Sequence, residues 1–167
     1  MSMTVEMLRK YRNHVFIETG SKQGECAVSA ITLVGFEEVH TIELDQDSYD
    51  KAKKRIAGFN NINLYLGDSA DWLPRILEKV TRPYTVWLDA HPLIENLDFN
   101  NTPILQELNA LKNTKLPRGF KILMDDLRLF SKDDRNKITE MARSIGTVSF
   151  ESQPYPEIER DDILVIM

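Results

Sequence analysis

The residues with the clearest chemical potential form a glycine-containing turn near the start of the chain, Glu18-Thr19-Gly20-Ser21, which closes at Gly24. Apolar, β-favouring residues precede this turn, and the segment that follows it has the pattern of a helix. A strand, a glycine turn and a helix direct backbone N–H groups and the positive end of a helix dipole at one point. The turn therefore suits a ligand with a carboxylate or phosphate, although such turns also occur where nothing binds.

Acidic residues follow each of the predicted parallel strands, at the edge of the sheet where α/β proteins bind their ligands. In chain order they are Glu18, Glu43 with Asp45, Asp68 with Ser69, Asp89 with His91, and Asp125 with Asp126. A polar residue after a strand can instead cap the next helix, and for Asp45 and Ser69 that interpretation is at least as good.

Two of these acids indicate an adenosine-containing ligand. Glu43 follows the second strand, some twenty residues past the glycine turn, where a carboxylate accepts hydrogen bonds from ribose hydroxyls. Asp68 follows the third strand and can accept a hydrogen bond from the adenine amine. ATP hydrolysis is disfavoured because the turn lacks a Walker lysine, which leaves S-adenosylmethionine (SAM) or NAD. The spacing Glu-x-Gly-x-x-x-Gly favours SAM over a dinucleotide. The expected SAM-binding residues are Glu18, Thr19, Gly20, Ser21, Gly24, Glu43, Asp68, Ser69 and Asp89.

A second group of acids follows two strands that we expect to be neighbours in the sheet. Asp89 follows the strand at 84–88, and Asp125 and Asp126 follow the strand at 120–124. Carboxylates that meet at one point repel each other unless a cation or protons relieve them. All-oxygen ligands suit Mg²⁺, Mn²⁺ or Ca²⁺, so these three acids are the predicted metal ligands. The alternative is that one aspartate caps a turn while the other is solvated. His91 is a candidate general base, metal ligand or adenine neighbour, or a packed loop histidine.

The elements that must position these residues alternate along the chain. Strands are predicted at 15–18, 39–44, 62–66, 84–88 and 120–124, with helices at 5–12, 25–34, 46–57, 70–80, 103–111 and, after Ser131 as its cap, 132–145. Thr102 is the predicted cap of the helix that starts at Pro103. The strands at 147–151 and 163–167 have no helix between them, so they should form an antiparallel hairpin around the turn at 154–156. The fold class is therefore α/β, a doubly wound, mostly parallel sheet of seven strands.

The length and composition of the chain indicate its class of protein and its number of domains. A length of 167 residues, with 42% hydrophobic and 28% charged residues, predicts a single globular domain over 1–167 with no transmembrane segment. No secretory signal is recognisable and the single Cys26 excludes an internal disulfide, so we expect a cytoplasmic protein. A net charge of −5 argues against non-specific nucleic-acid binding, and the basic residues at 51–55 are interpreted as a solvated helix face, with a local basic patch as the alternative. We expect neither a nucleic-acid nor a membrane partner.

Several segments together resemble the small bacterial class I SAM-dependent methyltransferases. The resemblance runs from about Val15 to Phe130 and rests on the motifs at 16–24, 35–44, 67–69, 87–91, 102–108 and 124–130. It implies a seven-stranded Rossmann-like sheet with SAM across the glycine turn. By similarity to metal-dependent O-methyltransferases of the catechol and macrolide-sugar type, Mg²⁺ would lie on Asp89, Asp125 and Asp126.

The chain departs from that family in two places. Catechol-type enzymes have a lysine base after the first metal aspartate, whereas Pro92 follows His91 here and no lysine occurs before Lys112, so His91 is the expected base. They have asparagine where this chain has Asp126. Without an added substrate domain, acceptor choice would fall to residues 92–101 or to a second subunit, as in a homodimer. The expected activity is methyl transfer to a hydroxyl of a small molecule or sugar. The alternatives are a catalytically silent SAM-binding or interaction module and, third, an NAD-dependent oxidoreductase.

Overall fold

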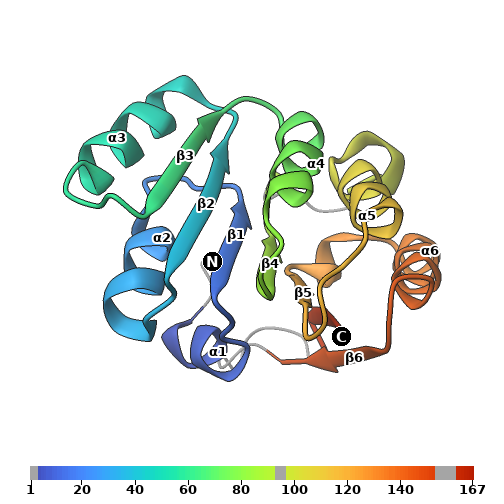
Figure 1. The fold of residues 1–167 in the computed structure, drawn as a ribbon. Coiled ribbons are helices and arrows are strands. Elements are labelled where there is room, and N and C mark those ends of the chain that lie inside the picture. The colour runs from blue at the N-terminus through green and yellow to red at the C-terminus, as the bar shows by residue number, and fades with distance from the viewer. Residues whose placement is uncertain (1–3, 93–96, 153–160) are drawn as a thin grey trace.

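The computed structural model describes residues 4–92, 97–152 and 161–167, which form one seven-stranded sheet with helices on both faces (Figure 1). The strands are β1 (Val15–Thr19), β2 (Glu38–Glu43), β3 (Ile62–Leu66), β4 (Tyr84–Leu88), β5 (Lys121–Met124), β6 (Val148–Glu151) and β7 (Ile163–Ile166). The α-helices are α1 (Val5–Lys10), α2 (Glu25–Ser29), α3 (Gln46–Ile56), α4 (Ser69–Lys79), α5 (Ile104–Asn113) and α6 (Lys132–Arg143). Shorter helical turns are η1 (Ala30–Val34), η2 (Phe99–Asn101) and η3 (Leu127–Leu129).

The strand order is β3-β2-β1-β4-β5-β7-β6. β1 to β5 pair in parallel, whereas β7 pairs antiparallel with both β5 and β6. This confirms the predicted doubly wound α/β class and its antiparallel C-terminal hairpin; the predicted turn at 154–156 lies outside the described residues. Because the order reverses beside β1, the segments that follow β1 and β4 lead to helices on opposite faces of the sheet, α2 and α5. Such a topological switch point is where α/β sheets place their ligand crevice.

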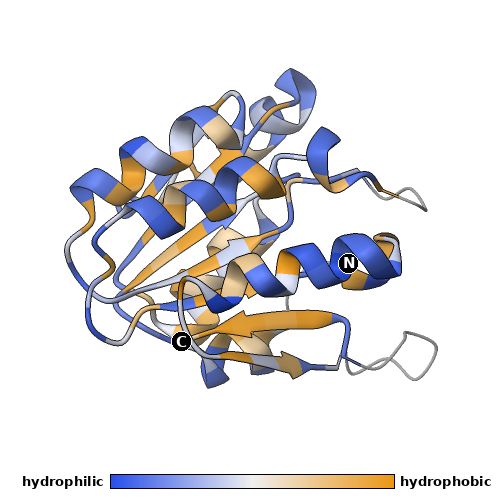
Figure 2. Ribbon diagram, turned by 90° about the vertical axis from the view of Figure 1, so that its right-hand side faces the viewer, coloured by the Kyte–Doolittle hydropathy of each residue, from blue (hydrophilic) through white to orange (hydrophobic). Residues whose placement is uncertain are grey.

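Each face of the sheet has its own hydrophobic core, because neighbouring residues of a strand point to opposite faces. Ile17 packs with α4, α5 and α6 on one face, whereas Phe16 packs with α1, α2 and α3 on the other. Figure 2 shows the consequence: hydrophobic residues concentrate on the strands between the two helical layers. Among the described residues, no helix is long and apolar enough to cross a membrane.

Two predicted helices differ in detail from the observed ones. The helix predicted over 25–34 is α-helical only to Ser29 and continues as the π-helix η1, where the N–H of Gly35 donates to the carbonyl of Ala30, five residues back. Thr102 does not cap α5, since its hydroxyl donates instead to the carbonyl of Phe99. Ile104 is the first residue of α5, and Pro103 occupies the cap position without a side-chain hydrogen bond.

Candidate functional site

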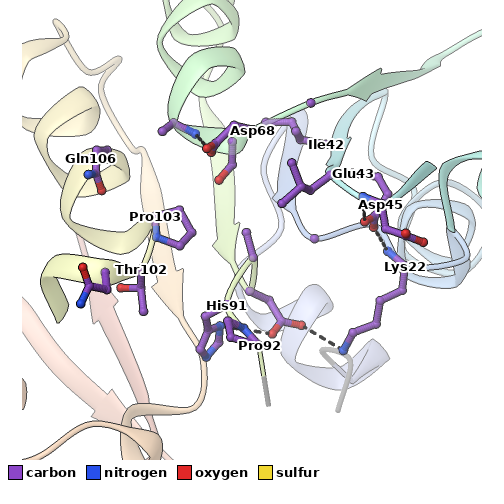
Figure 3. A pocket seen from close by; sticks show the side chains of 18 of the residues that line it. Lys22, Ile42, Glu43, Asp45, Asp68, His91, Pro92, Thr102, Pro103 and Gln106 are labelled. Atoms are coloured by element: carbon purple, nitrogen blue, oxygen red, sulfur yellow. Dashed lines mark hydrogen bonds and ion pairs between the residues drawn. The ribbon is translucent and has the colours of Figure 1, made fainter. Parts of the chain in front are cut away.

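A cavity of about 900 Å³ opens at the carboxyl ends of the parallel strands (Figure 3). The glycine turn and the end of β2 form one wall, and the start of α5 forms the opposite wall. Its lining residues are Gly20, Lys22, Ile42, Glu43, Leu44, Asp45, Gln46, Gly67, Asp68, Ser69, Ala70, Asp89, Ala90, His91, Pro92, Asn100, Asn101, Thr102, Pro103 and Gln106. The predicted site residues that line this cavity are Gly20, Glu43, Asp68, Ser69, Asp89 and His91. Part of the predicted acceptor segment at 92–101 also lines it, whereas residues 93–96 lie outside the described residues.

The glycine turn is shaped by close backbone contact. Gly20 has a φ of +86°, and a Cβ atom there would lie 2.5 Å from the carbonyl oxygen of Asp89. The N–H groups of Gly20 and Ser21 both donate to the carbonyl of Ile42, which ties the turn to β2. Gly24, in contrast, begins α2, and a Cβ there would meet Ala52 of α3 at 3.3 Å. Gly24 therefore serves helix packing and does not line the cavity.

Glu18 lies beneath the glycine turn in a buried hydrogen-bond network. Its carboxylate accepts a hydrogen bond from the Thr41 hydroxyl at 2.7 Å, and the hydroxyls of Thr41 and Ser21 are 2.6 Å apart. Burial raises the pKa of Glu18 to about 7, against the opposing effect of hydrogen bonds from Thr41 and Cys26. Glu18 and Ser21 do not line the cavity, so they support the turn from below.

Glu43 stands at the end of β2 with both carboxylate oxygens directed at the loop backbone. Oε2 accepts from the N–H of Lys22 at 2.7 Å, and Oε1 accepts from the N–H of Asp45 at 2.9 Å. These bonds fix the carboxylate in the cavity wall, while each oxygen keeps a lone pair for a ligand hydroxyl. Glu43 is the last residue of β2, a position that the hydrophobic pattern of the strand predicts.

The next two acids in the cavity wall also serve as helix caps. Asp45 accepts from the N–H of Ser48 at 2.8 Å and starts α3, and Asp68 accepts from the N–H of Ala70 at 2.9 Å and starts α4. The residue that caps α4 is therefore Asp68, not Ser69. Both caps remain at the cavity surface, where a second carboxylate oxygen can accept from a ligand.

Glu107 of α5 is a buried acid that the sequence did not single out. Its side chain is fully buried near Ser69 and Thr19, and among the described residues neither of its carboxylate oxygens has a hydrogen-bond partner. Burial raises the pKa of Glu107 to about 7, and the charges of Asp68 and Asp89 act in the same direction. Thr19 in turn accepts a long hydrogen bond from the N–H of Asp89, at 3.2 Å. The sequence does not indicate that Glu107 is buried, because an acid within a helical segment normally faces water.

The predicted metal acids fall into two overlapping clusters. Asp89, His91 and Asp126 offer ligand atoms that all lie within 4.8 Å of one another, and Asp125, Asp126 and Asp162 form the other cluster. His91 Nδ1 lies 3.9 Å from Asp89 Oδ1, and His91 Nε2 lies 3.8 Å from Asp126 Oδ2. The structure thus places a buried imidazole between Asp89 and Asp126, and it adds Asp162, which the sequence had not indicated.

Two cations already offset part of this negative charge. Arg128 Nη1 lies 2.5 Å from Asp126 Oδ1 and also contacts Asp162. Lys22 Nζ lies 3.9 Å from Asp89 Oδ2. Burial is the main cause that raises the pKa of Asp89 to about 6, with Lys22 opposing it. Neither cation was a sequence candidate, and two of these contacts, from Lys22 to Asp89 and from Arg128 to Asp162, join distant parts of the chain.

The remaining oxygens of these carboxylates face His91. Among the described residues, Asp89 Oδ1, Asp126 Oδ2 and both ring nitrogens of His91 are buried without a hydrogen-bond partner. Buried polar atoms without partners are costly, which favours a cation, a proton or a ligand group between them. Asp126 also has a φ of +58°, an uncommon backbone conformation for a residue other than glycine. A divalent cation held by these carboxylate oxygens is compatible with this arrangement.

Solved structures of other proteins match the fold of this chain, whereas the sequence comparisons find no match. Neither a protein-family model nor a curated protein sequence matches the chain. Among solved structures, the O-methyltransferase TomG from Streptomyces achromogenes, in complex with SAM, aligns at a TM-score of 0.67 and 18% identity, covering 97% of this chain and 76% of its own. The O-methyltransferase from Bacillus cereus, in complex with S-adenosylhomocysteine (SAH), aligns at 0.65 and 18%, covering 97% and 77%. The methyltransferase domain of bacterial CtHen1 aligns at 0.66 and 15%, covering 97% and 94%.

The chain therefore has the fold of the class I SAM-dependent methyltransferases, as its sequence predicted. Structural similarity at these identities shows the fold alone, since one fold can support many functions.

Proposed function

We propose that this protein is a SAM-dependent methyltransferase that transfers a methyl group to a hydroxyl oxygen of a small molecule or sugar. The observation that carries the proposal is the position of Glu43, Asp68 and Asp89 around one cavity, at the switch point beside Gly20. Glu43 is placed to accept hydrogen bonds from the ribose hydroxyls and Asp68 from the adenine amine. The reacting end of the donor would then lie toward Asp89 and His91.

The chemistry required of the protein is modest. The methyl group on the SAM sulfonium is already electrophilic, so the site has to align an acceptor oxygen with it and make that oxygen nucleophilic. We assign the proton of the acceptor hydroxyl to His91, which lines the cavity and has Asp126 behind its Nε2 atom. Asn101, Thr102 and Gln106 on the opposite wall supply polar contacts for the acceptor.

A divalent cation, Mg²⁺, Mn²⁺ or Ca²⁺, is the finer part of this proposal. Asp89 and Asp126 would hold it through the oxygens that face His91, because Lys22 and Arg128 approach the other oxygens. Asp125, expected as a third ligand, belongs to the cluster on the Asp162 side. A bound cation would lower the pKa of a coordinated acceptor hydroxyl.

Calorimetric titration with SAH tests the donor site. We expect saturable binding that Glu43→Ala weakens at least tenfold and that Asp47→Ala, an exposed acid on the adjacent helix, leaves unchanged. Failure of the wild-type protein to bind SAH at millimolar concentration would refute a SAM site.

Methyl transfer and metal dependence need a separate assay. Labelled SAM, offered with a panel of sugars and catechols, should label a hydroxyl, and Asp89→Asn or Asp126→Asn should abolish any stimulation by Mg²⁺, whereas Asp133→Asn should not. Tight SAH binding without transfer to any acceptor would instead favour a silent SAM-binding module. Transfer that ignores chelators and both aspartate variants would remove the metal from the proposal.

A further inference from the structure

The wall of the cavity opposite the donor site has no charged side chain in its described lining. It is formed by η2 and the start of α5. Its lining residues are Asn100, Asn101, Thr102, Pro103 and Gln106. Figure 3 shows Thr102, Pro103 and Gln106 across the cavity from Glu43. The charged residues of the described lining, four acids and Lys22, come from other elements, so an acceptor at this wall meets neutral side chains.

This wall is held in place by contacts behind it. The N–H of Leu97 donates to the carbonyl of Leu129 at 2.8 Å, and the side chains of Leu97 and Phe99 are buried in the hydrophobic core. The segment before α5 is thereby fixed to η3, which follows β5. A wall with a fixed shape can select among acceptors through the hydrogen bonds that it offers.

Asp98 determines which polar atoms the wall offers. Its carboxylate accepts from the backbone N–H of Asn100 at 2.9 Å, and from the side-chain amides of Asn100 and Asn101 at 3.1 Å and 2.7 Å. Because a carboxylate accepts hydrogen bonds and does not donate them, the amide nitrogens are the groups bonded to it. The carbonyl oxygen of each amide therefore remains for a ligand group that donates.

Thr102 adds a further acceptor. Its hydroxyl hydrogen is used in the bond to the carbonyl of Phe99 at 3.2 Å, so toward a ligand its oxygen can only accept. Each asparagine amide keeps one N–H, but the negative charge of Asp98 lies beside both amides and repels an anion. Lys137 of α6 does not supply a cation at the wall, because it is paired with Asp134 at 2.7 Å and does not line the cavity.

The described lining of the cavity contains no aromatic side chain other than the imidazole of His91. A flat aromatic acceptor such as a catechol therefore finds no phenyl or indole ring to stack on in that lining. A polyol carries several O–H donors, so it can bond several carbonyl and hydroxyl oxygens at once. The polar wall thus favours a polyol over an aromatic diol.

We propose that the wall from Asp98 to Gln106 selects a neutral, polyhydroxylated acceptor, such as a sugar or a cyclic polyol, and rejects acceptors that carry phosphate or carboxylate. The hydroxyls of the acceptor donate to the side-chain oxygens of Asn100, Asn101 and Thr102. The inference rests on the proposed function, because it names the acceptor class of the same methyl transfer. Rejection of anions follows from the charge of Asp98 and from the lack of a cation in the described part of this wall.

The test compares acceptors that differ in one charged group. Labelled SAM is offered with glucose and its 6-phosphate, with myo-inositol and its 1-phosphate, and with catechol and 3,4-dihydroxybenzoate, and kcat/KM is measured for each compound. We expect a neutral polyol to be the best acceptor of this set. Its kcat/KM should exceed that of its phosphate at least about tenfold, because a like charge beside Asp98 is unfavourable.

Two variants test whether the wall sets this selection. Gln106→Lys places a cation on the wall, and Asn109→Lys adds the same charge at an exposed position of α5 that does not line the cavity. Gln106→Lys should shift the ratio of the two kcat/KM values about tenfold toward the phosphate, the effect of a new charge-assisted hydrogen bond. Asn109→Lys should leave the ratio within about twofold. SAH calorimetry on both variants, with an unchanged dissociation constant, shows that the donor site is intact.

The selection by this wall is wrong if wild-type protein methylates an anionic compound as well as its neutral counterpart, or catechol better than both polyols. An unchanged ratio in Gln106→Lys, or an equal shift in Asn109→Lys, would also overturn it. These results leave the proposed function standing, since methyl transfer is still observed. Wild-type protein that binds SAH and methylates none of the compounds would overturn the transfer together with this inference, and protein that binds no SAH would overturn the donor site itself.

Discussion

The acids around the cavity differ in the partners that the fold gives them. Asp45 and Asp68 accept hydrogen bonds from helix N–H groups at the cavity surface, whereas Glu18 and Glu107 are removed from water. A carboxyl group removed from water without a cation favours its protonated form. The buried acids should therefore make the stability of this protein depend on pH near neutrality.

Glu107 gives the clearest test of this dependence. Its pKa rises from 4.5 to about 7 on folding, so between these values the folded state binds more protons than the unfolded state, and stability falls as pH rises. Glu107→Gln removes the ionisation and keeps the shape. The quantity to compare is the unfolding free energy of the variant minus that of wild type. This difference should be up to about 3 kcal/mol larger at about pH 8 than at about pH 5.

Urea unfolding at the two pH values measures this difference between variant and wild type, so the contributions of Asp68, Asp89 and other acids largely cancel. Glu140→Gln, at an exposed position of α6, serves as the control and should show no such dependence. A difference that is the same at both pH values would mean that Glu107 is ionised in the folded protein throughout this range.

Some site residues could be found from sequence and others could not, for a physical reason. Glu43, Asp68 and Asp89 follow apolar strands, and the strand pattern is local, so their common edge can be predicted. Lys22, Arg128 and Asp162 depend on contacts that join distant segments, such as the Arg128 N–H bond to Asp162 across 34 positions. No local pattern reports such a pair.

At the scale of helices, the cavity wall is built from helix starts. α3 and α4 begin at the cavity with capping aspartates, so the same side chains stabilise the helices and present oxygens to a ligand. The sequence predicted these helices well because their apolar faces repeat regularly. It missed the π-helical end of the segment at 25–34, since the change from bonds four residues back to the Gly35 bond five residues back leaves no mark in the apolar pattern.

Asp45 allows the structural share of this double role to be measured. Asp45→Ala removes the bond to the Ser48 N–H and should lower the free energy of unfolding by about 1 kcal/mol, whereas Asp45→Ser can still accept that bond and should lose much less. Urea unfolding of the two variants tests the cap, and SAH titration of each tests the ligand contact. Equal destabilisation by alanine and serine would show that the bond to Ser48 is not what stabilises α3.

At the scale of the whole molecule, the cavity exists only when the sheet is assembled. Its walls come from the ends of β1 to β4 and from the start of α5, which are joined through strand pairings between residues far apart in sequence. The unfolded chain therefore has no equivalent of the site. A ligand that binds in the cavity must stabilise the entire fold by mass action.

SAH at about 100 times its dissociation constant should accordingly raise the free energy of unfolding by about 2.7 kcal/mol, and the increase should follow the logarithm of ligand concentration. Urea unfolding with and without SAH measures this increase, with Glu43→Ala at the same SAH concentration as the control. A full increase in that variant would place SAH away from Glu43. Saturable SAH binding to the wild-type protein with no increase in its free energy of unfolding would mean that the unfolded chain binds SAH equally well. That result would contradict binding in this cavity, because the cavity forms only when β1, β2 and β4 are assembled.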